Sequence, residues 1–339
     1  MYLIFFIYIF KGFKLHNFMI INDRVYRGQE ISEPVLLDLI QTPEIQRLRR
    51  ISQFGMPSYL YNYPTFQRFE HSLGVMLLLR ELNASLEEQV AGLVHDVSHS
   101  AFSHLIDWIY GTETQENHQD EVLHERIRES SLPKILKRYG FDHQRVSNHD
   151  NYLLLEQEAP LLCADRVDSA LREMALCRNP EDVPFLRRSL IVHNRIMFDN
   201  KEAAEIFAEN YMDCQLNHWG AVEYKTRWRL LSQALKYAME EGTISYDDLF
   251  THDAAVLEKI GRSSNQAIRQ NLNLLMGKLN IVEDLEGPIV LKKKFRYVDP
   301  EFLEQERVYR VTEVNPKYKE QLDYEKEKGK EITRFRIVT

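Results

Sequence analysis

A polar pair at the end of an apolar stretch constrains the fold of this chain more than any other feature. The stretch ends at Val94, and His95 and Asp96 follow directly. Such an apolar run predicts a buried helix, yet an unpaired carboxylate is costly to bury. A bound cation would remove that cost. Imidazole and carboxylate ligands together favour Mn, Fe, Zn or Mg over softer metals.

Two further segments complete a set of four ligands. His71 lies in the sequence RFEHSLGV, and Asp165 lies in ADRVDSALRE. Two imidazoles and two carboxylates from three segments can close around one divalent ion. We therefore expect His71, His95, Asp96 and Asp165 to bind a divalent metal ion, with Mn, Fe, Mg, Zn and Co as candidates.

The three segments occur in the order RFEHSLGV, HDVSHSAFSH and ADRVDSALRE. This ordered set resembles the HD-domain phosphohydrolase superfamily, and within it the branch of the deoxynucleoside triphosphate triphosphohydrolases. The resemblance covers roughly residues 21–190, with a weaker similarity to about Phe250. It implies an all-helical core, a metal ion and hydrolysis of a phosphate ester. A lone His-Asp dipeptide would not be specific, but three ordered motifs are.

The resemblance assigns substrate contacts around the ligands. Arg68 precedes His71 by three residues, so a helix places both on one face, and the matching arginine of the family contacts phosphate. Gln53 lies in Gln-Phe-Gly, which resembles a segment whose glutamine touches the sugar of a deoxynucleotide. His104 matches a histidine near the substrate. We expect Gln53, Arg68 and His104 to bind substrate.

Catalytic roles follow from the same resemblance. His99 and Asp107 match residues that act in proton transfer or attack at the α-phosphate, and a histidine that titrates near neutral pH suits this work. The alternative is that His99 and His104 bind a second metal ion, as in some HD relatives. The family also has a downstream catalytic histidine, usually followed by Glu. His124 matches it, and His118 is the competing candidate.

Some positions depart from the family pattern. Ser169 stands where the triphosphohydrolases often carry an aromatic residue shortly after the last ligand, and no tyrosine-bearing substrate segment is recognisable downstream. The basic run Lys292 to Lys294 is interpreted as a solvated strand end. Recognition of base and sugar is therefore left open by the sequence.

Composition places the chain among ordinary globular proteins. It has 339 residues, 44% apolar and 28% charged, and a net charge of −8. This charge argues against a broad nucleic-acid-binding surface. The three cysteines have no metal-binding spacing and fit a reduced, cytoplasmic protein.

Apolar periodicity predicts a mainly α fold. Helices are expected from Pro34 to Glu240, including a long one from Leu153 to Leu176, with a β-hairpin near residues 190–198. Three parts are expected: residues 1–18, a helical HD phosphohydrolase domain at 19–250, and a small α+β subdomain at 251–339. The first ten residues are apolar but too few to span a bilayer. They are either a membrane-surface anchor or, as we prefer, an extension from an upstream start codon.

The sequence thus predicts a metal-dependent phosphohydrolase that acts on nucleotides, plausibly releasing triphosphate from a deoxynucleoside triphosphate. One alternative is a phosphomonoesterase or phosphodiesterase that uses the same HD metal site. Another is a nucleotide-sensing protein with a vestigial site. The expected partner is a nucleotide or another small phosphate ester, and a homo-oligomer is compatible with the resemblance.

Overall fold

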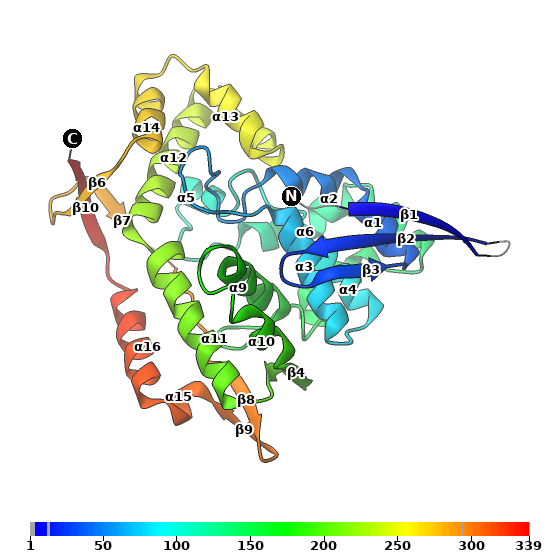
Figure 1. Ribbon diagram of the computed structural model, residues 1–339. Helices are drawn as coiled ribbons and strands as arrows, with labels where there is room; N and C mark the ends of the chain where they lie inside the picture. The colour runs from blue at the N-terminus through cyan, green and yellow to red at the C-terminus, as the bar shows by residue number, and fades with distance from the viewer. Residues whose placement is uncertain (1–3, 12–13, 293, 339) are drawn as a thin grey trace.

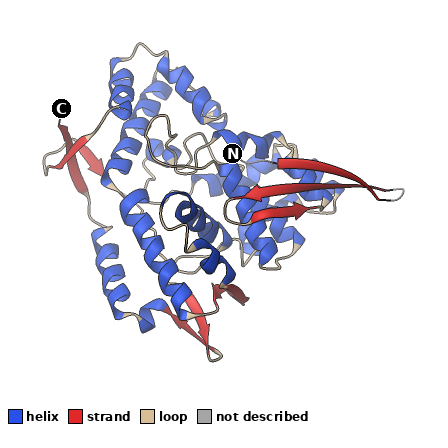
Figure 2. Cartoon of the chain, viewed as in Figure 1, coloured by secondary structure: helices blue, strands red, loops and turns tan. Residues whose placement is uncertain are grey.

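The computed structural model describes residues 4–11, 14–292 and 294–338 (Figure 1). The expected mainly α fold is confirmed: helices form the body, and the strands lie at three edges of it (Figure 2). The main helices around the site are α3 (Arg68–Glu81), α4 (Leu86–Val94), α5 (Leu105–Tyr110), α6 (His118–Arg128), α9 (Ala164–Cys177), α11 (Lys201–Cys214) and α12 (Val222–Glu240).

Further helices lie between and after these elements. The remaining helices before residue 222 are α1 (Pro34–Ile40), α2 (Pro43–Arg47), η1 (Leu48–Arg50), α7 (Leu132–Arg138), α8 (His143–Val146), η2 (His149–Asn151), α10 (Val183–Arg188) and the π-helix η3 (Gln215–Trp219). Those after α12 are η4 (Asp247–Phe250), α13 (Asp253–Gly261), α14 (Gln266–Met276), α15 (Val311–Val314) and α16 (Pro316–Lys328).

The described strands form three small sheets. One has the order β1 (Ile4–Lys11), β2 (Lys14–Asp23), β3 (Arg27–Ile31). The second has the order β4 (Leu190–His193), β5 (Arg195–Phe198), β8 (Glu301–Glu304), β9 (Arg307–Arg310). The third has the order β6 (Asn280–Glu283), β10 (Thr333–Val338), β7 (Ile289–Leu291). The hairpin expected near residues 190–198 is confirmed, since β4 and β5 pair antiparallel.

The N-terminal segment is a strand in its described part. β1 pairs antiparallel with β2, from Ile4 opposite Ile21 to Lys11 opposite Lys14. The two strands project from the helical body in Figure 1. Residues 1–3 and 12–13 of the expected leader lie outside the described residues. No described helix has the length and apolarity needed to cross a membrane.

The expected long helix from Leu153 to Leu176 is wrong in its first half. Helix α9 begins only at Ala164, and the preceding segment is irregular. Pro160 lacks the backbone N–H that a continuous helix needs. Leu162 instead forms an isolated bridge with Ile196 of β5. The late start places Asp165 in the first turn of α9.

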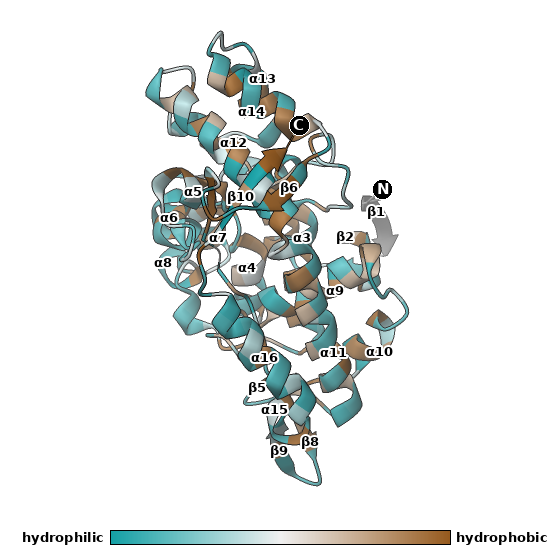
Figure 3. Cartoon of the chain, turned by 90° about the vertical axis from the view of Figure 1, so that its left-hand side faces the viewer, coloured by the Kyte–Doolittle hydropathy of each residue, from teal (hydrophilic) through white to brown (hydrophobic). Residues whose placement is uncertain are grey.

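The chain after Phe250 packs against the helical body at several places. β8 pairs parallel with β5, so the tail completes a sheet that the earlier chain begins. Helix α14 packs on α12, and Phe335 of β10 lies in the same apolar core as Trp228. Figure 3 shows α16 mainly in hydrophilic colours, as expected for a surface helix. A subdomain boundary at Phe250 stays a prediction.

Candidate metal centre and substrate cavity

Three helix ends bring the four predicted ligands together. His71 lies in the first turn of α3, His95 caps the C-terminus of α4 with Asp96 next to it, and Asp165 lies in the first turn of α9. His71, His95 and Asp96 are buried. Helices α3 and α4 pack against each other, and α3 also packs on α9, which fixes these ends in one place.

The ligand atoms surround a common point. Nε2 of His71 lies 2.7 Å from Oδ1 of Asp165 and 4.0 Å from Oδ2 of Asp96. Nε2 of His95 lies 3.4 Å from Oδ1 of Asp96 and 3.8 Å from Oδ1 of Asp165. One atom from each of His71, His95 and Asp96 falls within 4.8 Å of the other two. We call His71, His95, Asp96 and Asp165 the ligand set.

Neighbouring groups orient both imidazoles. Nδ1 of His71 donates to Oδ2 of Asp168 at 2.8 Å, and Nδ1 of His95 donates to the carbonyl of Gly92 at 2.7 Å. Nε2 of each ring therefore faces the ligand set. Nε2 of His95 is buried without a hydrogen-bond partner among the described residues. Oriented imidazoles and an orphaned ring nitrogen fit a divalent ion bound at this place.

The side chains of Asp168 and Arg172 behind His71 leave no room for a residue larger than glycine at position 74. Asp168 also accepts from Nε of Arg172 at 2.8 Å, and Nη2 of Arg172 donates to Asp23 at 2.8 Å. Asp168 and Arg172 are fully buried. A methyl group at Gly74 of α3 would overlap with both side chains. Glycine is therefore required where α3 and α9 approach closely.

Without a metal ion, a proton links the same groups. Burial disfavours a charged His71 ring, but hydrogen bonds to Asp165 and Asp168 outweigh burial and raise the pKa of His71 to about 9. Burial disfavours the charged form of Asp165 as well, yet the hydrogen bond from His71 keeps the pKa of Asp165 below its ordinary value. The proton thus occupies the position where a cation would neutralise the carboxylates.

Arg68 contacts Asp96, a member of the ligand set. Its Nη1 donates to both carboxylate oxygens of Asp96 at 2.8 Å. Its Nε donates to Oγ of Ser103 at 2.7 Å, and Nη2 donates to the carbonyl of Gln53 at 3.2 Å. The guanidinium is nearly fully buried in this network. Its expected contact with phosphate stays a prediction.

A cavity of about 270 Å³ opens beside the ligand set. Gln53, His99 and His104 line it, as expected for residues near a substrate. Its basic side chains are Arg68, Arg166, Lys225, Lys294 and Arg296. Its aromatic side chains beyond residue 200 are Tyr211, Trp219, Tyr224, Trp228, Phe295 and Tyr297, which we call the aromatic wall.

His99 and His104 are neutral in this environment, which differs from the expectation of a histidine that titrates near neutral pH. Burial, followed by the charge of Arg68, lowers the pKa of His99 to about 3, and burial lowers the pKa of His104. Nε2 of His99 lies 3.2 Å from Oδ1 of Asp96. Asp107 is not in the described cavity lining but lies behind His104, with Oδ2 4.0 Å from its Nδ1.

Neither expected downstream histidine lines the cavity in the described structure. His124 is exposed on α6, where its Nδ1 hydrogen-bonds with Oγ of Ser147 at 2.8 Å. His118 hydrogen-bonds with the hydroxyl of Tyr246 at 3.1 Å. His149, which belongs to none of the three motifs, does line the cavity. The His-Asp dipeptide at positions 149–150 was the sole signal for it in the sequence.

Sequence reasoning also missed the basic and aromatic lining. Glu116 is buried and accepts from Nζ of Lys225 at 3.2 Å and from Arg296. Of the basic run expected at a solvated strand end, Lys292 is exposed directly after β7 and Lys293 lies outside the described residues. Lys294 is half-buried instead: it lines the cavity, and its Nζ donates to the carbonyl of Gln115 at 2.8 Å. Trp219 ends the π-helix η3 and donates from Nε1 to Glu173 at 2.6 Å. A single-turn π-helix often marks a functional site.

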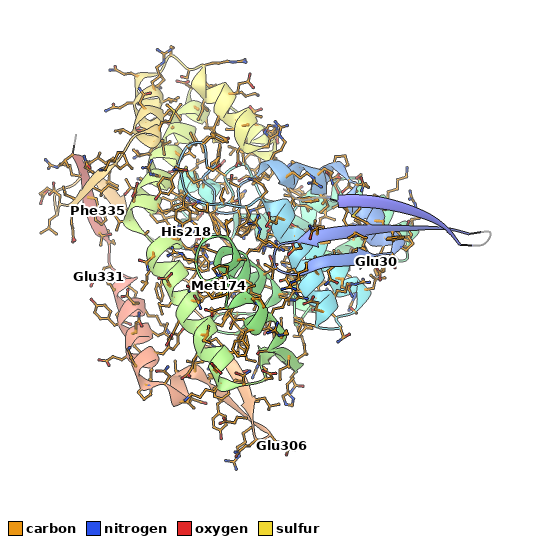
Figure 4. The ribbon with its side chains drawn as sticks, viewed as in Figure 1. Glu30, Met174, His218, Glu306, Glu331 and Phe335 are labelled. Carbon is orange, nitrogen blue, oxygen red and sulfur yellow. The ribbon has the colours of Figure 1, made fainter. Side chains whose placement is uncertain are left out.

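The interior position of this π-helix is visible in the side-chain view. His218 lies in the centre of the molecule in Figure 4, near Met174 of α9, whereas Glu306 and Glu331 lie at the periphery. Nδ1 of His218 donates to Glu173 at 2.7 Å, and its ring stacks on Tyr63 with centroids 3.9 Å apart. Glu173 thus holds two consecutive residues of η3 and fixes the orientation of Trp219.

Comparison with known proteins agrees with this geometry. The HD domain family model matches residues 68–175, which include all four members of the ligand set. The chain is 34% identical over 330 residues to the uncharacterized protein YdhJ of Bacillus subtilis, covering 94% of this chain and 99% of that one. This chain belongs to the HD-domain family. A divalent metal ion and hydrolase activity are therefore assigned to this HD-domain protein. Binding of that ion by all four residues of the ligand set stays a prediction.

Other relatives differ in how much of this HD-domain chain they match. The metal-dependent phosphohydrolase cns2 of Cordyceps militaris is 28% identical over 84% of this chain and 85% of its own. The deoxynucleoside triphosphate triphosphohydrolase SAMHD1 of Xenopus laevis is 28% identical over only 50% of this chain and 25% of its own. A phosphohydrolase structure from Bacteroides thetaiotaomicron shares the fold, with a TM-score of 0.66, 17% identity, and coverage of 88% of this chain and 95% of that one.

Proposed function

We propose that this HD-domain protein hydrolyses the phosphate ester of a nucleotide, with deoxynucleoside triphosphates as the leading candidates. The observation that carries this proposal is the cavity, which joins the ligand set to the aromatic wall in one space. Phosphate groups bind beside the ion, and a nucleobase stacks on aromatic rings. Base–aromatic stacking contributes about 1–3 kcal/mol per base.

The charges of the cavity suit an anionic substrate. In the described lining, five basic side chains accompany five carboxylates, those of Asp96, Glu116, Asp120, Glu156 and Asp165. The numbers of basic and acidic side chains in this lining are therefore equal. A divalent ion then makes the cavity net positive. Phosphoryl transfer requires such positive charge around the transferred group.

Each group of the cavity has a distinct task in this proposal. A divalent ion bound by the ligand set would polarise a phosphoryl oxygen and lower the pKa of a bound water. Asp168 and the Gly92 carbonyl orient the two ligand imidazoles. Neutral His99 and His104 would accept hydrogen bonds from the reacting groups or donate hydrogen bonds to them, and the carboxylate of Asp107 lies 4.0 Å behind His104. The aromatic wall holds the organic part of the substrate and excludes water from it.

A second candidate is a phosphomonoesterase or phosphodiesterase with the same metal site. Two observations favour it over a triphosphohydrolase. The match to SAMHD1 is partial, whereas the relative named simply a metal-dependent phosphohydrolase matches most of the chain. Ser169 lines the cavity without the aromatic ring that the triphosphohydrolases often carry there. A sensor with a vestigial site is disfavoured, because the ligand set is complete.

A substrate panel tests these candidates. Purified protein is incubated with Mn²⁺, Mg²⁺, Co²⁺ or Zn²⁺ and with deoxynucleoside triphosphates, ribonucleoside triphosphates, nucleoside monophosphates, cyclic nucleotides and a sugar phosphate. Release of triphosphate supports the leading proposal, and release of phosphate from monophosphates supports the second candidate. Hydrolysis of the sugar phosphate in preference to every nucleotide would contradict the proposal of a nucleotide substrate.

A further inference from the structure

His149 is a histidine of the cavity wall without an assigned task. It begins the short helix η2 and lines the cavity together with His95 and Asp165. Its ring centroid lies 6.4 Å from that of His95, so the two rings are neighbours. Nε2 of His149 is buried and has no hydrogen-bond partner among the described residues.

The local backbone holds this ring in place. The side chain of Asn148 accepts from the backbone N–H of Asp150 at 3.0 Å, which starts η2. The carbonyl of His149 accepts from the backbone N–H of Tyr152 at 2.9 Å. Nδ2 of Asn151 donates to the carbonyl of Arg145 at 3.1 Å, which ties the segment to the end of α8. The unpartnered nitrogen is therefore a fixed feature of the wall.

A buried polar atom without a partner is unfavourable, so a partner from the substrate is expected. The part of a substrate that reaches this position is the phosphate, because the phosphate must lie beside the ion held by His95 and Asp165. A phosphate offers only acceptor oxygens, and a neutral imidazole offers one N–H.

We propose that His149 donates a hydrogen bond from Nε2 to a phosphate oxygen of the substrate. A role as a ligand of a second ion is less consistent with the structure. Among the described residues, the one group of three or more metal-binding side chains that converges on a point is His71, His95 and Asp96. The inference rests on the phosphohydrolase chemistry of the HD family and does not require the substrate to be a nucleotide.

Binding of inorganic phosphate to the Mn²⁺-loaded protein tests the inference directly. Titration calorimetry compares wild type with His149→Ala and His149→Gln, because the amide nitrogen of Gln can donate at the position of Nε2. His143→Ala is the matched control, since His143 lies in the neighbouring helix α8 and outside the described lining. We expect phosphate to bind about 10- to 100-fold more weakly to His149→Ala, the usual value for a hydrogen bond to a charged group.

The other variants separate this role from its alternatives. His149→Gln and His143→Ala should bind phosphate within about threefold of wild type, and all four proteins should hold the same amount of Mn²⁺ by elemental analysis. Loss of Mn²⁺ in His149→Ala would show a metal ligand instead. Equal phosphate affinity in His149→Ala and wild type, or no binding to wild type, would overturn the inference.

Activity on a phosphate ester gives a second, independent test. The value of kcat/KM should fall in His149→Ala and recover in His149→Gln. A Gln variant as inactive as the Ala variant would show that the ring must accept a proton, which overturns a donor role. If His149→Ala does not fold, His149→Met provides a second side chain without a donor. A failed nucleotide panel with an intact phosphate effect would reject the nucleotide proposal alone.

Discussion

The ligand set and the aromatic wall line one cavity but are built in different ways. Each ligand lies at a helix end, and its orientation is fixed by a close neighbour such as Asp168 behind His71 or Gly92 behind His95. The aromatic wall comes from α11, η3, α12 and the segment 294–297, and it is held by long-range contacts. Arg296 reaches Glu116 across 180 positions of the chain.

This difference separates two tasks. The ligand set follows from the chemistry of one ion, which requires a fixed set of donor atoms at fixed positions. The aromatic wall determines which organic group fits beside the phosphate, and different rings would serve other substrates. Substitutions in the ligand set should therefore lower activity on every substrate, whereas substitutions in the aromatic wall should lower activity on some substrates more than on others. Five experiments test this separation.

The largest effect is expected for Asp96→Ala. Loss of this carboxylate removes a ligand and leaves Arg68 without its main partner, so bound metal and metal-dependent activity should both fall to background. Elemental analysis and hydrolysis assays measure the two quantities on the same preparation. Asp323→Ala, at an exposed site on α16, should keep about one ion per chain and full activity. Full metal occupancy in Asp96→Ala would remove Asp96 from the ligand set.

The pH dependence of metal binding gives the next effect. Since the pKa of His71 is raised to about 9 in the metal-free protein, metal binding must displace a proton below that pH. Metal affinity should rise about tenfold per pH unit, or about 100-fold between pH 6 and pH 8. Calorimetric titrations at several pH values measure it. An affinity independent of pH over this range would contradict a proton shared by His71, Asp165 and Asp168.

The same pKa fixes the sign of a stability change. A raised folded-state pKa means that the protonated His71 stabilises the metal-free fold fully below about pH 6.5, the ordinary pKa. This stabilisation should be lost as the pH rises through about 9. The melting temperature of the metal-free protein should therefore fall over this window, while that of the metal-loaded protein should not.

Asp168→Asn should have a smaller effect on metal binding. The amide cannot match the carboxylate that accepts from His71 and Arg172, so metal affinity should fall about 10- to 100-fold. The pH slope of metal binding should also become shallower, because the proton on His71 loses one acceptor. Asp323→Asn is the control on an exposed helix. Unchanged affinity and slope would show that Asp168 supports only the fold.

The smallest effect is expected in the aromatic wall. Trp219→Leu keeps an apolar side chain but removes a stacking surface, so KM for nucleotides should rise about tenfold, within the range for base stacking. Bound metal and the turnover of a sugar phosphate should stay near wild type. Kinetic assays of both substrates on one preparation decide this. An equal loss of activity on both substrates would show that the aromatic wall and the ligand set do not have separate tasks.

The sequence alone determined the mainly α fold and the expected ligand set. The four expected ligands lie together in the structure because each motif is short and lies on one helix end, where spacing along the chain fixes which side chains share a face. Their binding of a metal ion stays a prediction. The apolar run before His95 and Asp96 also predicted a buried helix end. Ligand chemistry then allows few combinations of histidine and aspartate.

Only the tertiary structure decided which other groups face the cavity. It pairs Arg68 with Asp96, brings His149 to the cavity in place of His124, and assembles the aromatic wall. It also shows that α9 begins at Ala164, whereas the apolar periodicity before Pro160 had predicted an earlier start. Such contacts join residues distant in the chain, and they depend on how helices pack against one another. Local periodicity carries no information about that packing, so the lining of the cavity becomes known only when the fold is.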